Sequence, residues 1–181
     1  MSESEVVGHM GRVIVTRLEP NEDLLLAIGN IVKRHGIKAG VVLSITGGLN
    51  KAVIQHFVEG QEQIGVIELP GPLEASGHGI VGWVEAPGTG KAPFGVGRYI
   101  DGEPYVHVHI TLTSAHQTIC GHLMEGTTIR SKHRVSHFTV MVAEVEGAAL
   151  NMKVDAGEEN EYKGRGVYHE LVKLPAFPSN G

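Results

Sequence analysis

Several features that would each point to a particular class of protein are scarce in this sequence. Cys120 is the single cysteine among 181 residues, so no disulfide can form within one chain. No run of apolar residues approaches the roughly 20 that a transmembrane helix needs. Because 41% of the residues are hydrophobic, a buried core can form without disulfides, and we expect a folded protein with no membrane partner.

Basic residues are also few. Fifteen lysines and arginines stand against 20 acidic residues, which gives a formal net charge of −5 and a pI near 6.1. This balance opposes a broad surface for the phosphates of nucleic acids. Residues 1–5 lack the basic and apolar regions of a signal peptide, so we expect a cytoplasmic protein.

The most informative stretch is Tyr-Val-His-Val-His-Ile-Thr-Leu-Thr at residues 105–113, followed by Cys-Gly-His-Leu at residues 120–123. Successive side chains of a strand point to opposite faces, so His107 and His109 share one face and the aliphatic residues lie on the other. If a four-residue loop reverses the chain, His109 lies opposite His122. The same register places the apolar residues of the second segment on the aliphatic face, which supports this pairing.

Three imidazoles in this arrangement predict a metal site. Cross-strand Cβ atoms lie about 4.5–5.5 Å apart and residues two apart on a strand about 6.6 Å, so His107, His109 and His122 can converge on one ion. Neutral imidazole suits zinc, and also iron, nickel or copper, and three protein ligands leave a position open for water. Cys120 shares this face as a nearby thiol, a further ligand or a small buried residue. Any one of these histidines alone would more simply be a solvated side chain.

The histidine segments also resemble a known family. Gly-Glu-Pro-Tyr-Val-His-Val-His at residues 102–109 and Gly-His-Leu-Met-Glu-Gly at residues 121–126 resemble the signature of the PPC domain, the plants-and-prokaryotes conserved domain. The sequences Leu-Glu-Pro-Asn-Glu-Asp at 18–23, His-Gly-Ile-Lys-Ala-Gly at 35–40 and the glycine turn Thr-Gly-Gly-Leu at 46–49 agree with it, so the resemblance covers most of residues 11–145. It implies an α+β fold, mostly antiparallel sheet with one main helix, that assembles as a homotrimer. In prokaryotic members the matching histidines are expected to hold a metal ion.

The distribution of elements fits such a domain. A strand at residues 11–19 precedes a helix that begins at residues 20–23, with acidic residues in its first turn, and runs to about His35. Short β-rich runs bounded by Gly and Pro follow at residues 40–45, 52–58, 63–69, 73–84, 105–113, 118–123, 136–145 and 167–174. We expect one domain over residues 11–175, with tails at 1–10 and 176–181. Residues 86–103 form an inserted loop, which is either a plain surface insertion or a lid over the site.

Two further residues are candidates for the metal shell or for a small ligand. Glu74 and His78 lie in Leu-Glu-Ala-Ser-Gly-His-Gly at residues 73–79, which resembles the strand and glycine turn upstream of the histidine motif in the family. The simpler alternative is that Glu74 is a solvated surface carboxylate and His78 a histidine in a turn.

DNA binding is the function that the family label suggests, because plant members carry an AT-hook beside the domain. Arg130, Lys132 and Arg134 form the densest basic cluster, and a trimer would bring three copies together. The sequence Lys-Gly-Arg-Gly at residues 163–166 lacks the first arginine and the proline of an AT-hook. With an excess of acidic residues elsewhere, DNA binding is the less favoured alternative.

Metal-dependent catalysis is another alternative. The His-x-His and distant His arrangement is similar to the metal motif of α-acetolactate decarboxylase, whose fold resembles that of the PPC domain. A lyase of this kind would use the metal to polarise a small oxygen-rich substrate, with Glu74 or Glu125 carrying a proton. The metal could also be purely structural, joining two strands or two subunits. We favour a divalent metal, zinc, that takes part in sensing or acting on a small ligand.

Overall fold

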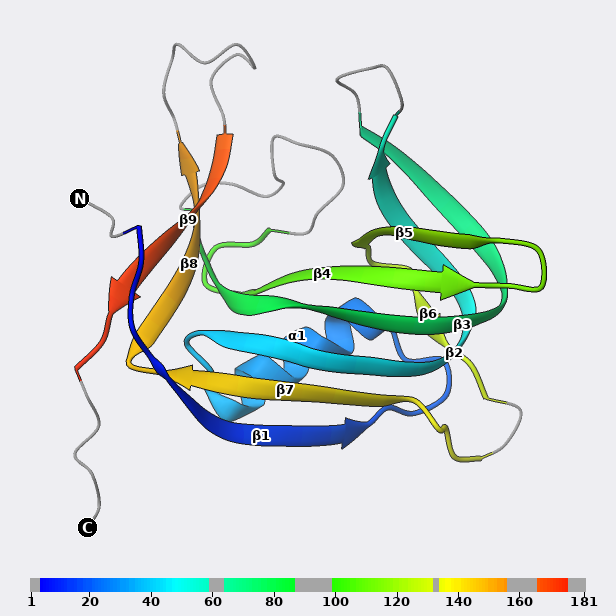
Figure 1. Ribbon diagram of the computed structural model, residues 1–181, viewed down its shortest axis with the longest axis horizontal. Helices are drawn as coiled ribbons and strands as arrows, with labels where there is room; N and C mark the ends of the chain where they lie inside the picture. Colours follow the sequence, from blue (N-terminus) through cyan, green and yellow to red (C-terminus); the bar gives the residue numbers. More distant parts are fainter. Residues whose placement is uncertain (1–3, 59–63, 87–98, 132–133, 156–165, 176–181) are drawn as a thin grey trace.

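The computed structural model describes residues 4–58, 64–86, 99–131, 134–155 and 166–175. Within these residues it contains one helix, α1 (Leu24–His35), and a largely antiparallel sheet, which confirms the predicted α+β class. The strands, shown in Figure 1, are β1 (His9–Arg17), β2 (Gly40–Phe57), β3 (Ile64–Glu85), β4 (Pro104–Thr113), β5 (Thr118–Leu123), β6 (Thr128–Ile129), β7 (Thr139–Glu146), β8 (Ala148–Asp155) and β9 (Gly166–Lys173).

The sheet has the strand order β1-β7-β2-β5-β4-β3-β8-β9, with β6 paired to β2. Strands β2 and β3 also pair with each other, so β2, β3, β4 and β5 form a closed circuit of neighbours. In the view of Figure 1, α1 lies behind the strands. The helix buries its apolar face against the main core, which includes aliphatic residues of β4. The opposite face of β4 therefore points away from the helix, and its side chains lie outside this core.

The helix begins at Leu24, after residues 20–23, which the sequence pattern predicted as its first turn. Asp23 is the N-cap, and its Oδ1 accepts a hydrogen bond of 3.0 Å from the Leu26 amide, so residues 20–23 precede the helix and its first turn has no acidic residue. The predicted end is confirmed. His35 is the last helical residue, and Gly36 follows it with a left-handed backbone (φ 65°) that ends the helix.

Two predicted pairs of short strands are each one long strand. Residues 40–45 and 52–58 belong almost entirely to β2, and residues 63–69 and 73–84 belong largely to β3. The pairing of the two strands shifts register at two places, and both strands bend along their length (Figure 1). The expected glycine turn at 46–49 was wrong because Gly47 lies inside β2. A Cβ at Gly47 would lie 2.6 Å from Phe138 Cδ2, so this glycine makes room for the Phe138 ring.

Glycines 77 and 79 have a similar role in β3. They were predicted to form a turn, yet both lie in the strand where it pairs with β4. A Cβ at Gly77 would lie 2.7 Å from the His109 carbonyl oxygen, and one at Gly79 would collide with the His107 carbonyl oxygen. These two glycines therefore let β4 approach closely at its two histidines.

Strands β6 and β8 were not predicted. β8 pairs in parallel with the end of β3 through Trp83 and Asn151, and in antiparallel fashion with β9. Alternate residues of β8 contribute to a second, smaller apolar cluster, namely Ala148, Leu150 and Met152. That alternation is visible in the sequence and could have indicated the strand.

The predicted inserted loop, residues 86–103, falls mainly outside the described residues, which do not include residues 87–98. Its role as a lid therefore stays a prediction. Its two described ends are joined: Asp101 Oδ1 accepts a hydrogen bond of 2.9 Å from the Ala86 amide, and the Gly102 amide donates to the Val84 carbonyl oxygen at 2.9 Å. Among the residues that the structure describes, no helix is long and apolar enough to span a membrane.

Candidate metal centre

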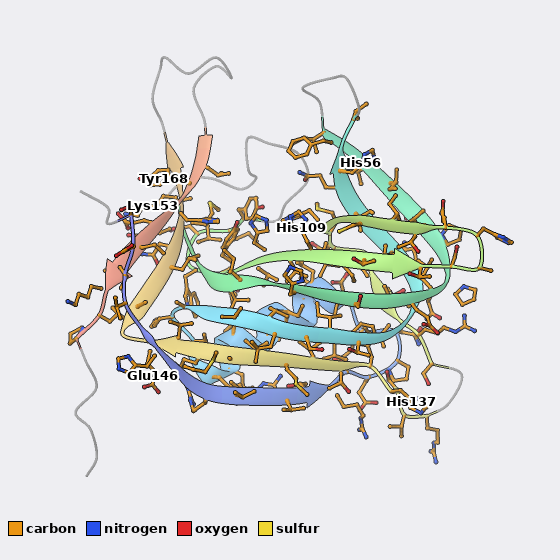
Figure 2. All side chains as sticks on the ribbon, in the orientation of Figure 1. His56, His109, His137, Glu146, Lys153 and Tyr168 are labelled. Atoms are coloured by element: carbon orange, nitrogen blue, oxygen red, sulfur yellow. The ribbon has the colours of Figure 1, made fainter. Side chains whose placement is uncertain are left out.

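The hairpin of β4 and β5 has the register that the sequence predicted. Thr113 pairs with Thr118, and the ladder continues to His109 opposite His122. On the other face, Val108 and Leu112 of β4 and Leu123 of β5 are fully buried in the main core. Burial of this aliphatic face holds the hairpin in register, and the register in turn places the histidines together on the opposite face. Figure 2 labels His109 on β4 beside β5.

The three imidazoles of His107, His109 and His122, called the histidine trio below, are close enough to share one ion. One ligand atom of each ring lies within 4.8 Å of the corresponding atoms of the other two. The Nε2 atoms of His107 and His109 are 3.3 Å apart. Two nitrogens that each lie about 2.0–2.1 Å from a tetrahedral zinc ion are about 3.3–3.4 Å apart, so this pair already has the required spacing. The donor set fits zinc.

Burial favours the neutral form of two of these rings. Burial, together with smaller contributions from the neighbouring His107 and His109, lowers the pKa of His122 to about 4. Burial also lowers the pKa of His107, again with a contribution from His109 and from His169. A neutral imidazole has the free lone pair that a metal requires, so both rings are in their ligating form near neutral pH.

Two residues that the sequence reasoning missed lie beside the trio. The Tyr105 hydroxyl oxygen is 2.8 Å from His107 Nδ1 and 2.9 Å from His169 Nε2. Burial raises the pKa of Tyr105, and the nearby Tyr99 raises it further, so the hydroxyl keeps its proton and can donate to one ring while it accepts from the other. If Nδ1–H of His107 donates to Tyr105, which donates to His169, then Nε2 of His107 keeps its lone pair for an ion.

Alternation along β4 could have found Tyr105, because it lies two residues before His107 and so shares its face. His169 could not be found in this way. It reaches Tyr105 from β9, 64 residues away in the sequence. Cys120 is exposed on the histidine face opposite Thr111, as the register predicted, and is not among the clustered ligand atoms of the trio.

The other two candidate ligand residues, Glu74 and His78, are not among the clustered ligand atoms of the trio. His78 is exposed and pairs directly with His109, so its side chain is on the same face of the sheet. The aromatic rings that contact the trio are instead those of Tyr105 and His169. Glu74 pairs with Thr113 at the far end of β4 and lines a separate pocket. The structure does not bring Glu74 to the trio, and a ligand-binding role for Glu74 or His78 stays a prediction.

The predicted basic cluster is only partly described. Arg130 is half-buried, donates its backbone amide to the Gly48 carbonyl oxygen at 2.9 Å, and lines the same pocket as Glu74. Arg134 is exposed. Lys132 lies outside the described residues, so the cluster as a whole stays a prediction.

Comparison with known proteins identifies a family and a shared fold. The profile of the Plants and Prokaryotes Conserved (PCC) domain matches residues 6–145. No curated protein sequence matches the chain.

Three solved structures resemble this one at sequence identities that show the fold alone. A metal-containing protein from Archaeoglobus fulgidus has a TM-score of 0.65 and 21% identity, over 96% of this chain and 100% of that one. A plant- and prokaryote-conserved (PPC) protein from Pyrococcus horikoshii has a TM-score of 0.63 and 23% identity, over 96% and 99%. A candidate DNA-binding protein from Ralstonia eutropha JMP134 has a TM-score of 0.55 and 17% identity, over 90% of each chain.

Proposed function

Because this chain belongs to the Plants and Prokaryotes Conserved (PCC) domain family, we propose that it is a metal-binding member that holds one divalent ion, zinc, through His107, His109 and His122. The observation that carries this proposal is the convergence of three imidazole nitrogens within 4.8 Å, one pair of them at the spacing of a zinc site. A protein of similar fold from Archaeoglobus fulgidus is described as metal-containing, which supports it.

The proposed role is to sense or act on a small ligand. A divalent ion with three protein ligands has room for a further one, and it would supply a positive charge that polarises a carbonyl or carboxylate. The chain's own residues prepare the site: His107 and His122 are kept neutral by burial, and Tyr105 orients the His107 ring. His109 is exposed, so a ligand from solvent can approach the trio from its side.

We also propose that the protein forms a homotrimer, as its family resemblance implies. Strands β1 and β7 expose several large apolar side chains, which supports an interface on this part of the sheet. The most exposed of them are Met10, Val13, Val15 and Met141. In this proposal, residues 11–175 act as one domain, because β8 continues the sheet from β3 and β9 completes it.

Metal content tests the assignment of the ligands. We expect about one equivalent of zinc in the purified protein and near zero in His107→Ala, measured by elemental analysis. His116→Ala is the matched control, since His116 is an exposed histidine on the loop between β4 and β5. Equal zinc content in the parent and both variants would reject the trio as the metal site.

A further inference from the structure

A pocket of about 350 Å³ lies between α1 and the first half of β4, beside the histidine trio. It forms where β4 extends beyond its partner: the β4–β5 ladder ends at His109 and His122, while residues 104–108 of β4 continue without β5. The volume falls at the lower end of the range for small-molecule sites. The walls are mainly apolar, with contributions from Leu25, Leu26, Ile100, Val106, Leu123 and Met124.

The polar groups of this pocket lie among apolar walls. His122 belongs to both the pocket wall and the trio, so it is the residue through which the pocket adjoins the proposed metal site. Lys33 and Glu103 also line it, and the Lys33 ammonium lies 2.9 and 3.0 Å from the two carboxylate oxygens of Glu103. Because this ion pair is internally neutralised, the uncompensated positive charge available to a ligand would be at the His122 end.

A glycine in the helix keeps the pocket open. Gly29 lies in the middle of α1, where glycine is about 1 kcal/mol less favourable than alanine. Packing does not require it, since a Cβ at this position would lie 3.8 Å from Pro104 Cβ and 3.9 Å from Val106 Cγ2, which are ordinary contacts. A longer side chain at this position would enter the pocket. The space that Gly29 leaves open therefore explains why a residue that weakens the helix stands here.

We propose that this pocket binds a small amphipathic carboxylic acid, with its short apolar chain against the walls of α1 and β4 and its carboxylate at His122. This inference rests on the proposed function, because the positive charge that attracts a carboxylate to the histidine trio comes from the divalent ion that it would hold. It names the class of ligand that the metal centre would sense or act on. A carboxylate without the chain would lack the apolar contacts with the pocket walls, and an apolar chain without the carboxylate would lack the attraction to the ion.

Binding of a simple fatty acid to the zinc-loaded protein tests the proposal. Hexanoate should bind saturably in isothermal titration calorimetry, whereas acetate and 1-hexanol should bind at least tenfold more weakly. From acetate through butyrate to hexanoate, affinity should rise by about fourfold for each methylene that enters the pocket. A flat series, or hexanol that binds as tightly as hexanoate, would overturn the proposal.

Two variants locate the binding site. Gly29→Leu should lower hexanoate affinity at least tenfold while zinc content stays at one equivalent. Arg34→Leu adds the same side chain at an exposed position of α1 outside the pocket and should leave both unchanged. Equal hexanoate binding in Gly29→Leu and the parent would overturn the location of the binding site. If Gly29→Leu does not fold, the series from acetate to hexanoate tests the proposal.

Failure of the metal assignment would be seen separately. Zinc content is measured before any acid is added, so a parent protein without zinc would reject the proposed function itself. A zinc-loaded parent that does not bind hexanoate would reject only the pocket ligand. Hexanoate that binds equally well with and without zinc would overturn the placement of its carboxylate.

Discussion

At the scale of single residues, the two ring nitrogens of His107 have different partners. Nε2 lies 3.3 Å from Nε2 of His109, within the histidine trio, and Nδ1 lies 2.8 Å from the Tyr105 hydroxyl. In metal sites the nitrogen that does not bind the ion is commonly held by such a hydrogen bond, which sets the tautomer and the ring orientation. Tyr105 is therefore a positioning residue for His107, which we propose as a metal ligand.

Tyr105→Phe removes this hydrogen bond and keeps the aromatic ring. We expect zinc affinity to fall by roughly 10- to 100-fold, the usual effect of losing such a partner, as measured by competition with a chelator. Tyr168→Phe is the control, because Tyr168 is an exposed tyrosine on β9. The positioning role is refuted if the two variants bind zinc equally tightly.

At the scale of the elements, Asp23 joins the start of α1 to the turn that follows β5. Its Oδ1 caps the helix through the Leu26 amide at 3.0 Å, and its Oδ2 accepts from the Gly126 amide at 2.6 Å. Gly126 has a positive φ of 102°, a conformation that glycine adopts without strain. One carboxylate thus holds together two segments that flank the pocket.

Asp23→Ala should lower the free energy of unfolding by about 1–3 kcal/mol, because it removes the cap and leaves the Gly126 amide without this acceptor. Urea denaturation of metal-free protein measures the change. Arg34→Ala is the control, since it replaces an exposed residue of the same helix and should alter stability by less than about 0.5 kcal/mol. An Asp23→Ala protein as stable as the control would contradict the role of the cap.

At the scale of the whole molecule, exposed apolar residues gather on β1 and its neighbour β7. Val15 is 61% exposed and pairs with Met141, which is 37% exposed, so the two form one patch across the strands. Exposed apolar surface of this kind often marks an interface between proteins. The patch is where we place the proposed contact between subunits.

Light scattering in solution should give a mass of three times the 19.4 kDa of one chain. Val15→Lys places a charge in the patch and should shift the protein towards the monomer, whereas Phe57→Lys changes an exposed residue elsewhere and should not. A parent protein that is a clean monomer would contradict the trimer. A trimer that persists in Val15→Lys would place the interface on another surface.

Net charge makes DNA the less favoured partner. Each chain has a formal charge of −5, so a trimer would have a still larger negative charge that repels phosphates. We expect no shift of duplex DNA in a gel assay, even at low ionic strength. A complex that forms at low salt and is weakened by Arg134→Ala would instead support the DNA-binding alternative.

Features that depend on local periodicity could be predicted from the amino-acid sequence. Alternation along residues 105–113 and a four-residue loop were enough to predict that His109 faces His122, because a strand has a period of two and its apolar face must be buried. The end of α1 was predictable for a similar reason, since Gly36 adopts a backbone conformation that most residues avoid.

Features that depend on contacts between distant segments became visible in the folded chain alone. The bends of β2 and β3 place glycines inside strands, where Gly47 accommodates Phe138 rather than forming a turn. The approach of His169 to Tyr105 and the pocket beside His122 bring together residues from separate strands and from α1. Such contacts follow from long-range strand pairing, and no periodicity within a short window of sequence records them.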